Sequence, residues 1–147
     1  MVEAKVIAKL NKHLANQVVL YVKLRNYHWN ITGPQFFNIH NLTEEYYEHI
    51  AETLDAVAER IRQLDEPPLS TMQSYLEHAT LLEEQETAFT AEEVVKRVLA
   101  DFQTLLDDSN QILTTAEDED DTATADVMAE QIDWLEESIW MLKAFLG

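Results

Sequence analysis

Glycine and proline, the residues that most often interrupt regular structure, are rare in this chain. Its 147 residues include only two glycines and three prolines, too few to supply the tight turns of a fold built from many short strands. Leucine, alanine, glutamate and glutamine are abundant instead, and all four favour helices. The sequence therefore predicts an all-α protein, and its length predicts a single domain over residues 1–147.

Apolar residues recur at helical spacing in four long segments. The first runs from about residue 4 to 31 and the second from about 36 to 63, with Gly33-Pro34 between them. The third opens at Thr90, which forms a capping-box sequence with Glu93, and the acidic run of residues 117–121 separates it from the fourth. Helices of roughly 35–40 Å suit a four-helix bundle.

The connections between these segments differ in length. Short turns join the first pair and the last pair, so each pair is expected to form an antiparallel hairpin. Residues 66–89 are far more than a hairpin turn needs and are expected to cross the bundle, with a short helix at about residues 71–78. Two hairpins joined by one long crossover is the ferritin-like arrangement of a four-helix bundle.

Charge and composition exclude several classes of protein. Ten basic residues against 28 acidic ones give a formal net charge of −18, which disfavours binding to the phosphate backbone of DNA or RNA. The chain has no cysteine, which excludes disulfides, thiolate metal sites and cysteine nucleophiles. No apolar run approaches the roughly 20 residues of a membrane span, and the N-terminal residues have no apolar signal core, so a cytoplasmic protein is expected.

Two histidines and three carboxylates stand out from the helical pattern as candidate metal ligands. They are His28, His40, Glu44, Asp55 and Glu59. At about 100° per residue, the four that lie on the second segment fall on one flank, beside its apolar face. Imidazole nitrogen together with carboxylate oxygen is a ligand set that suits iron.

A single copy of the second helix cannot bring these ligands to one ion. Glu44 and Asp55 are about 16 Å apart along the axis. An antiparallel second copy would place His40 and Glu44 opposite Asp55 and Glu59, and a two-fold axis near residue 50 would create two identical sites. His28 joins His40 because the two stand about six residues before and after the turn, level in the hairpin.

From spacing alone, two interpretations stay open. His28 also lies on the apolar stripe of its helix, where a hydrogen-bonded core histidine is the ordinary explanation. Solvation of helix surfaces explains most of the 28 acids. The Glu-x-x-His pair of interior di-iron bundles is absent at every histidine, which argues against a centre of that kind.

Three stretches resemble the Dps family of mini-ferritins. They are residues 26–40 (NYHWNITGPQFFNIH), 55–60 (DAVAER) and 140–147 (WMLKAFLG), and the likeness runs from about residue 10 to the end. The resemblance implies a hollow dodecameric shell with ferroxidase sites at its two-fold interfaces. Such shells oxidise Fe(II), usually with hydrogen peroxide, store the ferric mineral and protect against oxidative damage.

The family pattern also implies a role for each ligand. Asp55 and Glu59, with His28 from the partner subunit, would hold the first iron, and His40 and Glu44 would hold the second more weakly. The family usually has aspartate where this chain has Glu44, so the carboxylate stands one methylene further out. Zinc could occupy the same ligands without redox turnover.

Other residues carry further expectations. Trp29 resembles the family's tryptophan beside the site, thought to take up oxidising equivalents, and simple packing explains it equally well. Asp121 and Asp126 lie near the third turn, where the family forms acidic pores, and are pore candidates. The alternative functions are a non-catalytic metal-binding shell and a DNA-binding nucleoid protein. Direct DNA binding is disfavoured because no lysine-rich tail precedes the first helix.

Overall fold

The computed structural model describes the backbone of residues 2–147 and the side chains of residues 5–147. Its helices are α1 (Val2–Asn30), α2 (Phe36–Gln63), α3 (Met72–His78), α4 (Ala91–Asp118) and α5 (Thr122–Leu146). Within this described part the only β-type pairing is an isolated bridge between Ile31 and Phe89. The expectation of an all-α protein is confirmed.

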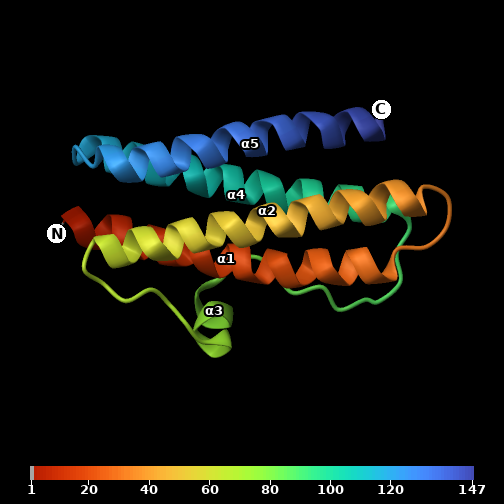
Figure 1. Cartoon of the computed structure of the whole chain (residues 1–147), viewed down its shortest axis with the longest axis horizontal. Coiled ribbons are helices and arrows are strands. Elements are labelled where there is room, and N and C mark those ends of the chain that lie inside the picture. The colour runs from red at the N-terminus through yellow and green to blue at the C-terminus, as the bar shows by residue number, and fades with distance from the viewer. Residues whose placement is uncertain (1) are drawn as a thin grey trace.

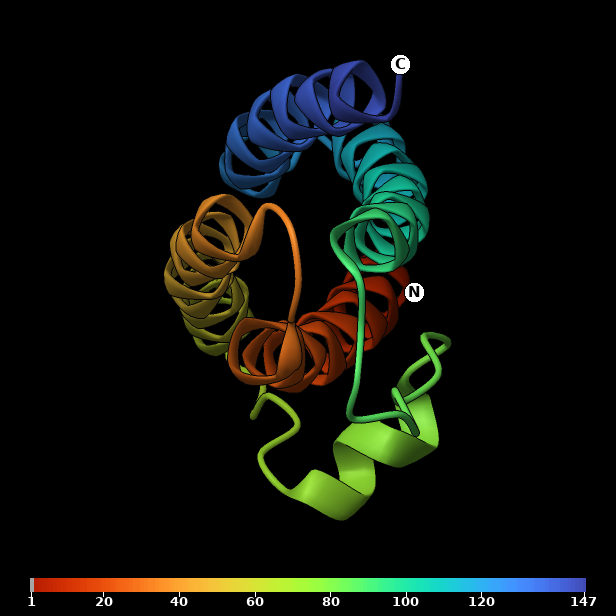
Figure 2. The ribbon, with the colours of Figure 1, turned by 90° about the vertical axis from the view of Figure 1, so that its right-hand side faces the viewer.

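The four long helices form a bundle of two hairpins. Helix α1 packs along α2, α4 packs along α5, and the two hairpins meet chiefly where α1 contacts α4. In the end view of Figure 2 the long helices surround one core, and α3 lies outside it. The crossover between α2 and α4 runs the length of the bundle and carries α3 against α1 (Figure 1). The predicted ferritin-like arrangement, with a short helix in the crossover, is therefore confirmed.

Capping residues set where the helices begin. The Thr90 side chain accepts a hydrogen bond from the Glu93 backbone, and the Glu93 side chain accepts one from the Thr90 backbone, so α4 begins where its capping box predicted. Thr71 and Ser74 form the same reciprocal pair at the start of α3. Between α1 and α2, Gly33 adopts a φ of 93°, a conformation that glycine reaches without steric cost.

The crossover is fixed to the bundle by polar contacts. The buried Asn16 side chain accepts hydrogen bonds from the backbone of Thr80 at 2.7 Å and of Leu81 at 3.0 Å. Further along, the Tyr27 hydroxyl donates to Glu84, which is also paired with Arg97 of α4 at 3.0 Å. These contacts hold a long segment that contains little regular structure. No helix in the described part of the chain is long and apolar enough to cross a membrane.

The acidic run of residues 117–121 does separate the last two helices, but its first two residues belong to α4, which continues to Asp118. The helix ends in a Schellman motif, in which the Asp121 backbone N–H donates to the carbonyl of Ala116 at 2.8 Å and that of Asp120 donates to Glu117. This motif requires a left-handed residue, and Asp120 fills that place with a φ of 58°.

Replacing Asp120 by glycine is expected to stabilise the chain by about 1 kcal/mol. Glycine adopts the left-handed conformation without strain, and the change removes a negative charge from the negative end of the α4 dipole. Urea unfolding of the metal-free protein measures the change. Asp107→Gly, in the exposed interior of α4, is the control and is expected to destabilise by a similar amount. A loss of stability in Asp120→Gly would contradict the assignment of the cap.

Candidate metal centre

His28 and His40 form a stacked pair at one end of the first hairpin. Their ring centroids are 3.7 Å apart and the rings are 15° from parallel. The Nδ1 of His28 lies 2.7 Å from the carbonyl oxygen of His40, and the Nδ1 of His40 lies 2.8 Å from the carbonyl oxygen of His28. The register predicted from the Gly33-Pro34 turn is therefore confirmed.

This reciprocal pairing fixes which nitrogen of each ring carries a hydrogen. A carbonyl oxygen only accepts, so each Nδ1 must carry the hydrogen and donate it. In the neutral imidazole the Nε2 atom then keeps its lone pair, the state that a metal ligand requires. His28 is hydrogen-bonded and only 7% exposed, as a core histidine would be, yet its Nε2 remains free to bind an ion.

The carboxylates lie along the exposed flank of α2. Glu44, Asp55 and Glu59 are all exposed, as the helical projection predicted. Within the described part of the chain, no group of three or more histidine, aspartate or glutamate side chains comes close enough to hold a metal ion. The structure thus brings His28 of α1 and His40 of α2 together, and it leaves Asp55 and Glu59 several turns away from His40 along α2.

An aromatic and cationic group lies beside the histidines, and the sequence analysis did not single it out as part of the site. The buried Tyr47 ring meets His28 edge-on at 5.3 Å, and its hydroxyl lies 3.3 Å from Glu44 Oε1. The Arg25 guanidinium lies 3.9 Å above the Tyr47 ring and donates to the Tyr21 hydroxyl. Helical spacing could have identified both residues, since Arg25 is one turn before His28 and Tyr47 is one turn after Glu44.

Electrostatics around this group follow from its packing. Burial raises the pKa of the Tyr47 hydroxyl, Arg25 partly offsets that rise, and Glu44 adds to it. The hydrogen bond to Tyr21 raises the pKa of Arg25 against the effect of burial, and nearby Glu44 raises it further. Tyr47 is therefore a neutral hydroxyl able to donate to the Glu44 carboxylate, and Arg25 is a fixed positive charge.

Trp29 is 65% exposed, so packing within its own chain does not explain it. Its only described ring interaction is with Arg25, whose guanidinium lies 6.0 Å from the ring centroid. Large apolar surface left open to water commonly marks a contact with another molecule.

The two pore candidates differ in their surroundings. Asp121 caps α5 by accepting from the Thr124 backbone, and its carboxylate pairs with Arg60 at 2.9 Å. Burial would raise the pKa of Asp121, but bonds from Thr124 and the Arg60 charge bring it below its usual value. Asp126 is exposed. Asp121 thus has a structural role within its own chain. A pore lined by Asp121 or Asp126 stays a prediction.

Comparison with known proteins gives the family. The chain matches the ferritin-like domain over residues 7–147. It is 40% identical over 137 residues to a DNA protection during starvation protein of Helicobacter pylori, covering 92% of this chain and 95% of that one. The chain belongs to the Dps family.

Solved structures of related proteins agree closely with this fold. Antigen TpF1 of Treponema pallidum superposes with a TM-score of 0.98 at 36% identity, covering 99% of this chain and 94% of that one. A Dps protein of Vibrio cholerae, described as a member of a superfamily of ferritin-like diiron-carboxylate proteins, gives 0.96 at 33% identity, with 99% and 91% covered. The resemblance to the Dps family inferred from the sequence is confirmed.

Proposed function

We propose that this Dps-family chain is an iron-storage and detoxification protein, a ferroxidase that oxidises Fe(II) with hydrogen peroxide and stores the ferric product in a hollow shell. One observation carries the proposal. Within the described part of one chain there are two incomplete ligand sets and no complete one. The incomplete sets are the stacked His28–His40 pair and the Asp55–Glu59 pair. Membership of a ferritin-like family supports iron as the metal.

A two-fold arrangement of two subunits completes both sets. When two copies of α2 run antiparallel, His28, His40 and Glu44 of one chain face Asp55 and Glu59 of the other, and the same contact occurs twice. Asp55 and Glu59, with His28 of the partner subunit, would hold the first iron. His40 and Glu44 would hold the second. The family pattern supports a dodecamer built from such pairs.

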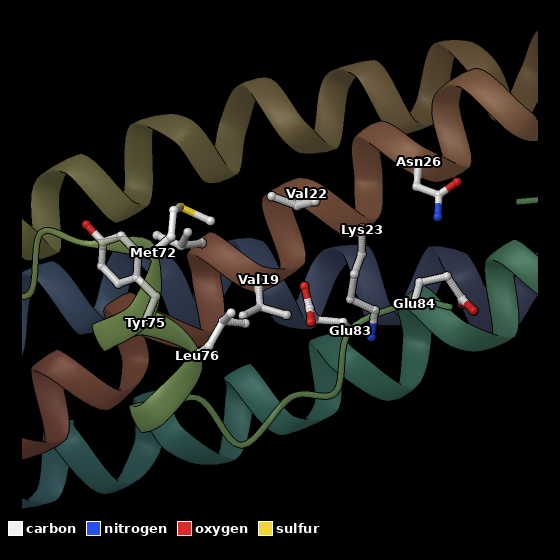
Figure 3. A pocket seen from close by; sticks show the side chains of 10 residues that line it. Val19, Val22, Lys23, Asn26, Met72, Tyr75, Leu76, Glu83 and Glu84 are labelled. Carbon is white, nitrogen blue, oxygen red and sulfur yellow. The ribbon is translucent and has the colours of Figure 1, made fainter. Parts of the chain in front are cut away.

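Exposed apolar surface beside the histidines supports a subunit contact on this face. Val22 is half exposed on α1, two turns before Trp29. It lines a groove between α1 and α3 together with Met72 and Leu76, which are also exposed (Figure 3). Val22 also lines a second hollow with Arg25 and Trp29. The two hollows share Val22 and together extend from α3 to Trp29, the residue after His28, and a second subunit would cover them.

The chemistry of the ligand set suits two-electron oxidation. Two Fe(II) ions held side by side each give one electron to a peroxide molecule, whose O–O bond breaks to leave two hydroxide ions and two Fe(III) ions. No hydroxyl radical is released when both electrons are supplied together. Carboxylate and imidazole ligands with open positions admit the peroxide to the iron.

The direct test is anaerobic Fe(II) binding followed by peroxide addition, monitored by the absorbance of ferric products. We expect fast oxidation at about half an equivalent of peroxide per iron, the stoichiometry of two-electron chemistry, and loss of that fast phase in Asp55→Ala/Glu59→Ala. Glu136→Ala/Glu137→Ala removes two exposed carboxylates of α5 and is the matched control. Metal binding without accelerated oxidation would leave a passive metal-binding shell and overturn the ferroxidase.

Tyr47 is expected to tune the second iron position. Its hydroxyl lies within reach of one Glu44 oxygen and leaves the other free for the ion. A hydrogen bond to a carboxylate that binds a metal typically changes metal affinity by about 10-fold or more. Tyr47→Phe should therefore weaken the second of two Co(II) binding steps and spare the first.

A double-mutant cycle separates this effect from general disturbance of the fold. Glu44→Asp draws the carboxylate back by one methylene, out of reach of Tyr47, so Tyr47→Phe should have little effect on second-site affinity in that background. Equal losses in both backgrounds, or an equal loss at the first site, would show that Tyr47 does not act through Glu44.

A further inference from the structure

A layer of buried polar side chains divides the core of the bundle. On one side lies an apolar cluster that includes Leu10, Leu14, Ile112 and Met128. On the other lies a larger cluster that includes Leu20, Phe102, Leu105 and Leu135. The polar residues between the two clusters are all buried, and they are His13, Asn16, Gln17, Asp108, Ser109 and Gln131.

Hydrogen bonds connect the centre of this layer across three helices. Gln131 Oε1 of α5 lies 2.8 Å from His13 Nε2 of α1 and 3.4 Å from Gln17 Nε2. Gln17 Nε2 also donates to Thr53 Oγ1 of α2 at 2.8 Å. The amide nitrogen of Gln17 is thus fully used, and its carbonyl oxygen must find a donor elsewhere.

A small cavity lies where that donor is missing. It measures about 10 Å³, and polar side chains of Gln17, His49, Thr53 and Gln131 line it together with apolar ones. Gln17 Oε1 and His49 Nε2 are both buried without a hydrogen-bond partner in the structure. Because Gln17 is only 2% exposed, bulk water does not supply the missing donor. The smallest cavities that hold a water are about this size, roughly 10–15 Å³.

We propose that this cavity binds one water molecule, which donates a hydrogen bond to Gln17 Oε1 and accepts one from His49 Nε2. Buried polar atoms in native proteins nearly always have partners, and one water satisfies both atoms at once. An apolar molecule would leave both unsatisfied, and a cavity of this size admits nothing larger than water. The water links α1 to α2 and completes the hydrogen bonding of Gln17.

His49 is held in place for this role. Its ring stacks on Trp134 of α5, with centroids 3.9 Å apart and planes 15° from parallel. Burial lowers the pKa of His49, against the opposing effect of Glu52, so the ring is neutral near pH 7. On α2, His49 lies about 180° from His40 and therefore faces away from the candidate metal centre.

The water has a route to solvent. A surface recess of about 200 Å³ between α2 and α5 is lined by His49, Thr53 and Gln131, which also line the cavity, together with Glu52 and Glu130. Small movements of the three shared side chains would join the two spaces. The bound water is therefore expected to exchange without unfolding of the bundle.

The test is a crystal structure of the assembled protein together with a double-mutant cycle. The expected density is a water within about 3.2 Å of both Gln17 Oε1 and His49 Nε2. An empty cavity, or a direct hydrogen bond between the two side chains, would overturn the proposal. The crystal structure of the unaltered protein decides the matter even if a variant fails to fold.

The cycle compares His49→Phe, Gln17→Met and the double variant by thermal unfolding. A shared water makes the two changes non-additive, because either one removes a partner of the same molecule. The double variant should lose less than the sum of the single shifts, by about 2–4 °C. His49→Phe combined with exposed His78→Gln is the control and should be additive. Additivity in the His49–Gln17 cycle would contradict a bridging water.

Discussion

Mixing a chain that carries His28→Ala with one that carries Asp55→Ala/Glu59→Ala is expected to restore Fe(II) oxidation that neither variant has alone. In a two-fold pair, one site takes its histidines from the first chain and its carboxylates from the second, and the other site does the reverse. One site of the mixed pair then contains every change, and the other contains none. Refolding equal amounts together should regenerate about a quarter of the wild-type sites.

The matched control is a mixture of His28→Ala with His40→Ala. Both changes fall in the same ligand set, so every site in every pair retains one altered histidine and no activity should return. Peroxide-driven oxidation by the purified mixtures measures the outcome. Recovery in neither mixture, with folded mixed assemblies demonstrated by mass spectrometry, would contradict ligand sharing between subunits. Full activity of His28→Ala alone would remove His28 from the site.

Acid is expected to destabilise the folded chain through His13. This side chain is fully buried, and burial lowers its pKa, with Gln131 and Asp108 opposing the shift and Lys12 adding to it. Unfolded histidine titrates near pH 6.5, so below that pH the unfolded chain binds a proton that the folded chain does not. Stability should fall by up to about 1.4 kcal/mol per pH unit per subunit until the folded pKa is reached, and His13 should have no effect at higher pH.

Urea unfolding of the metal-free protein at a series of pH values measures this dependence. His13→Gln removes the titrating group and should flatten the slope between pH 5 and 6.5. The remaining slope includes His49, whose pKa burial also lowers. His78 is exposed, and His78→Gln should behave like the wild type. An unchanged slope in His13→Gln would show that His13 is not the group responsible.

Local sequence signals predicted most of the fold because they act over one or two helical turns. The apolar period placed α2 at residues 36–63, and the Thr90–Glu93 capping box placed the start of α4. The turn at Gly33-Pro34 placed His28 level with His40, since a hairpin fixes the register of residues near it. These contacts depend on neighbours in the sequence.

The polar layer escaped prediction because its contacts are distant in sequence. His13 and Gln131 are 118 residues apart, and Gln17 and Gln131 are 114 apart. On α1 alone, His13 and Gln17 are only interruptions in an apolar stripe, and no local rule supplies their partners. The sharing of ligands between subunits stays a prediction for a related reason. The single chain contains both ligand sets, but the partner subunit's surface that would face each set is not part of that chain.

The reciprocal bonding of His28 and His40 has a thermodynamic consequence. Each imidazole is held by the main chain next to the other, so both rings lose their rotational freedom when the hairpin folds. The two ligand nitrogens are therefore already ordered before an ion binds, and ion binding carries no further entropic cost for ordering them. The exposed Asp55 and Glu59 side chains have no such support in the single chain. Coordination would therefore order the carboxylates much more than the histidines.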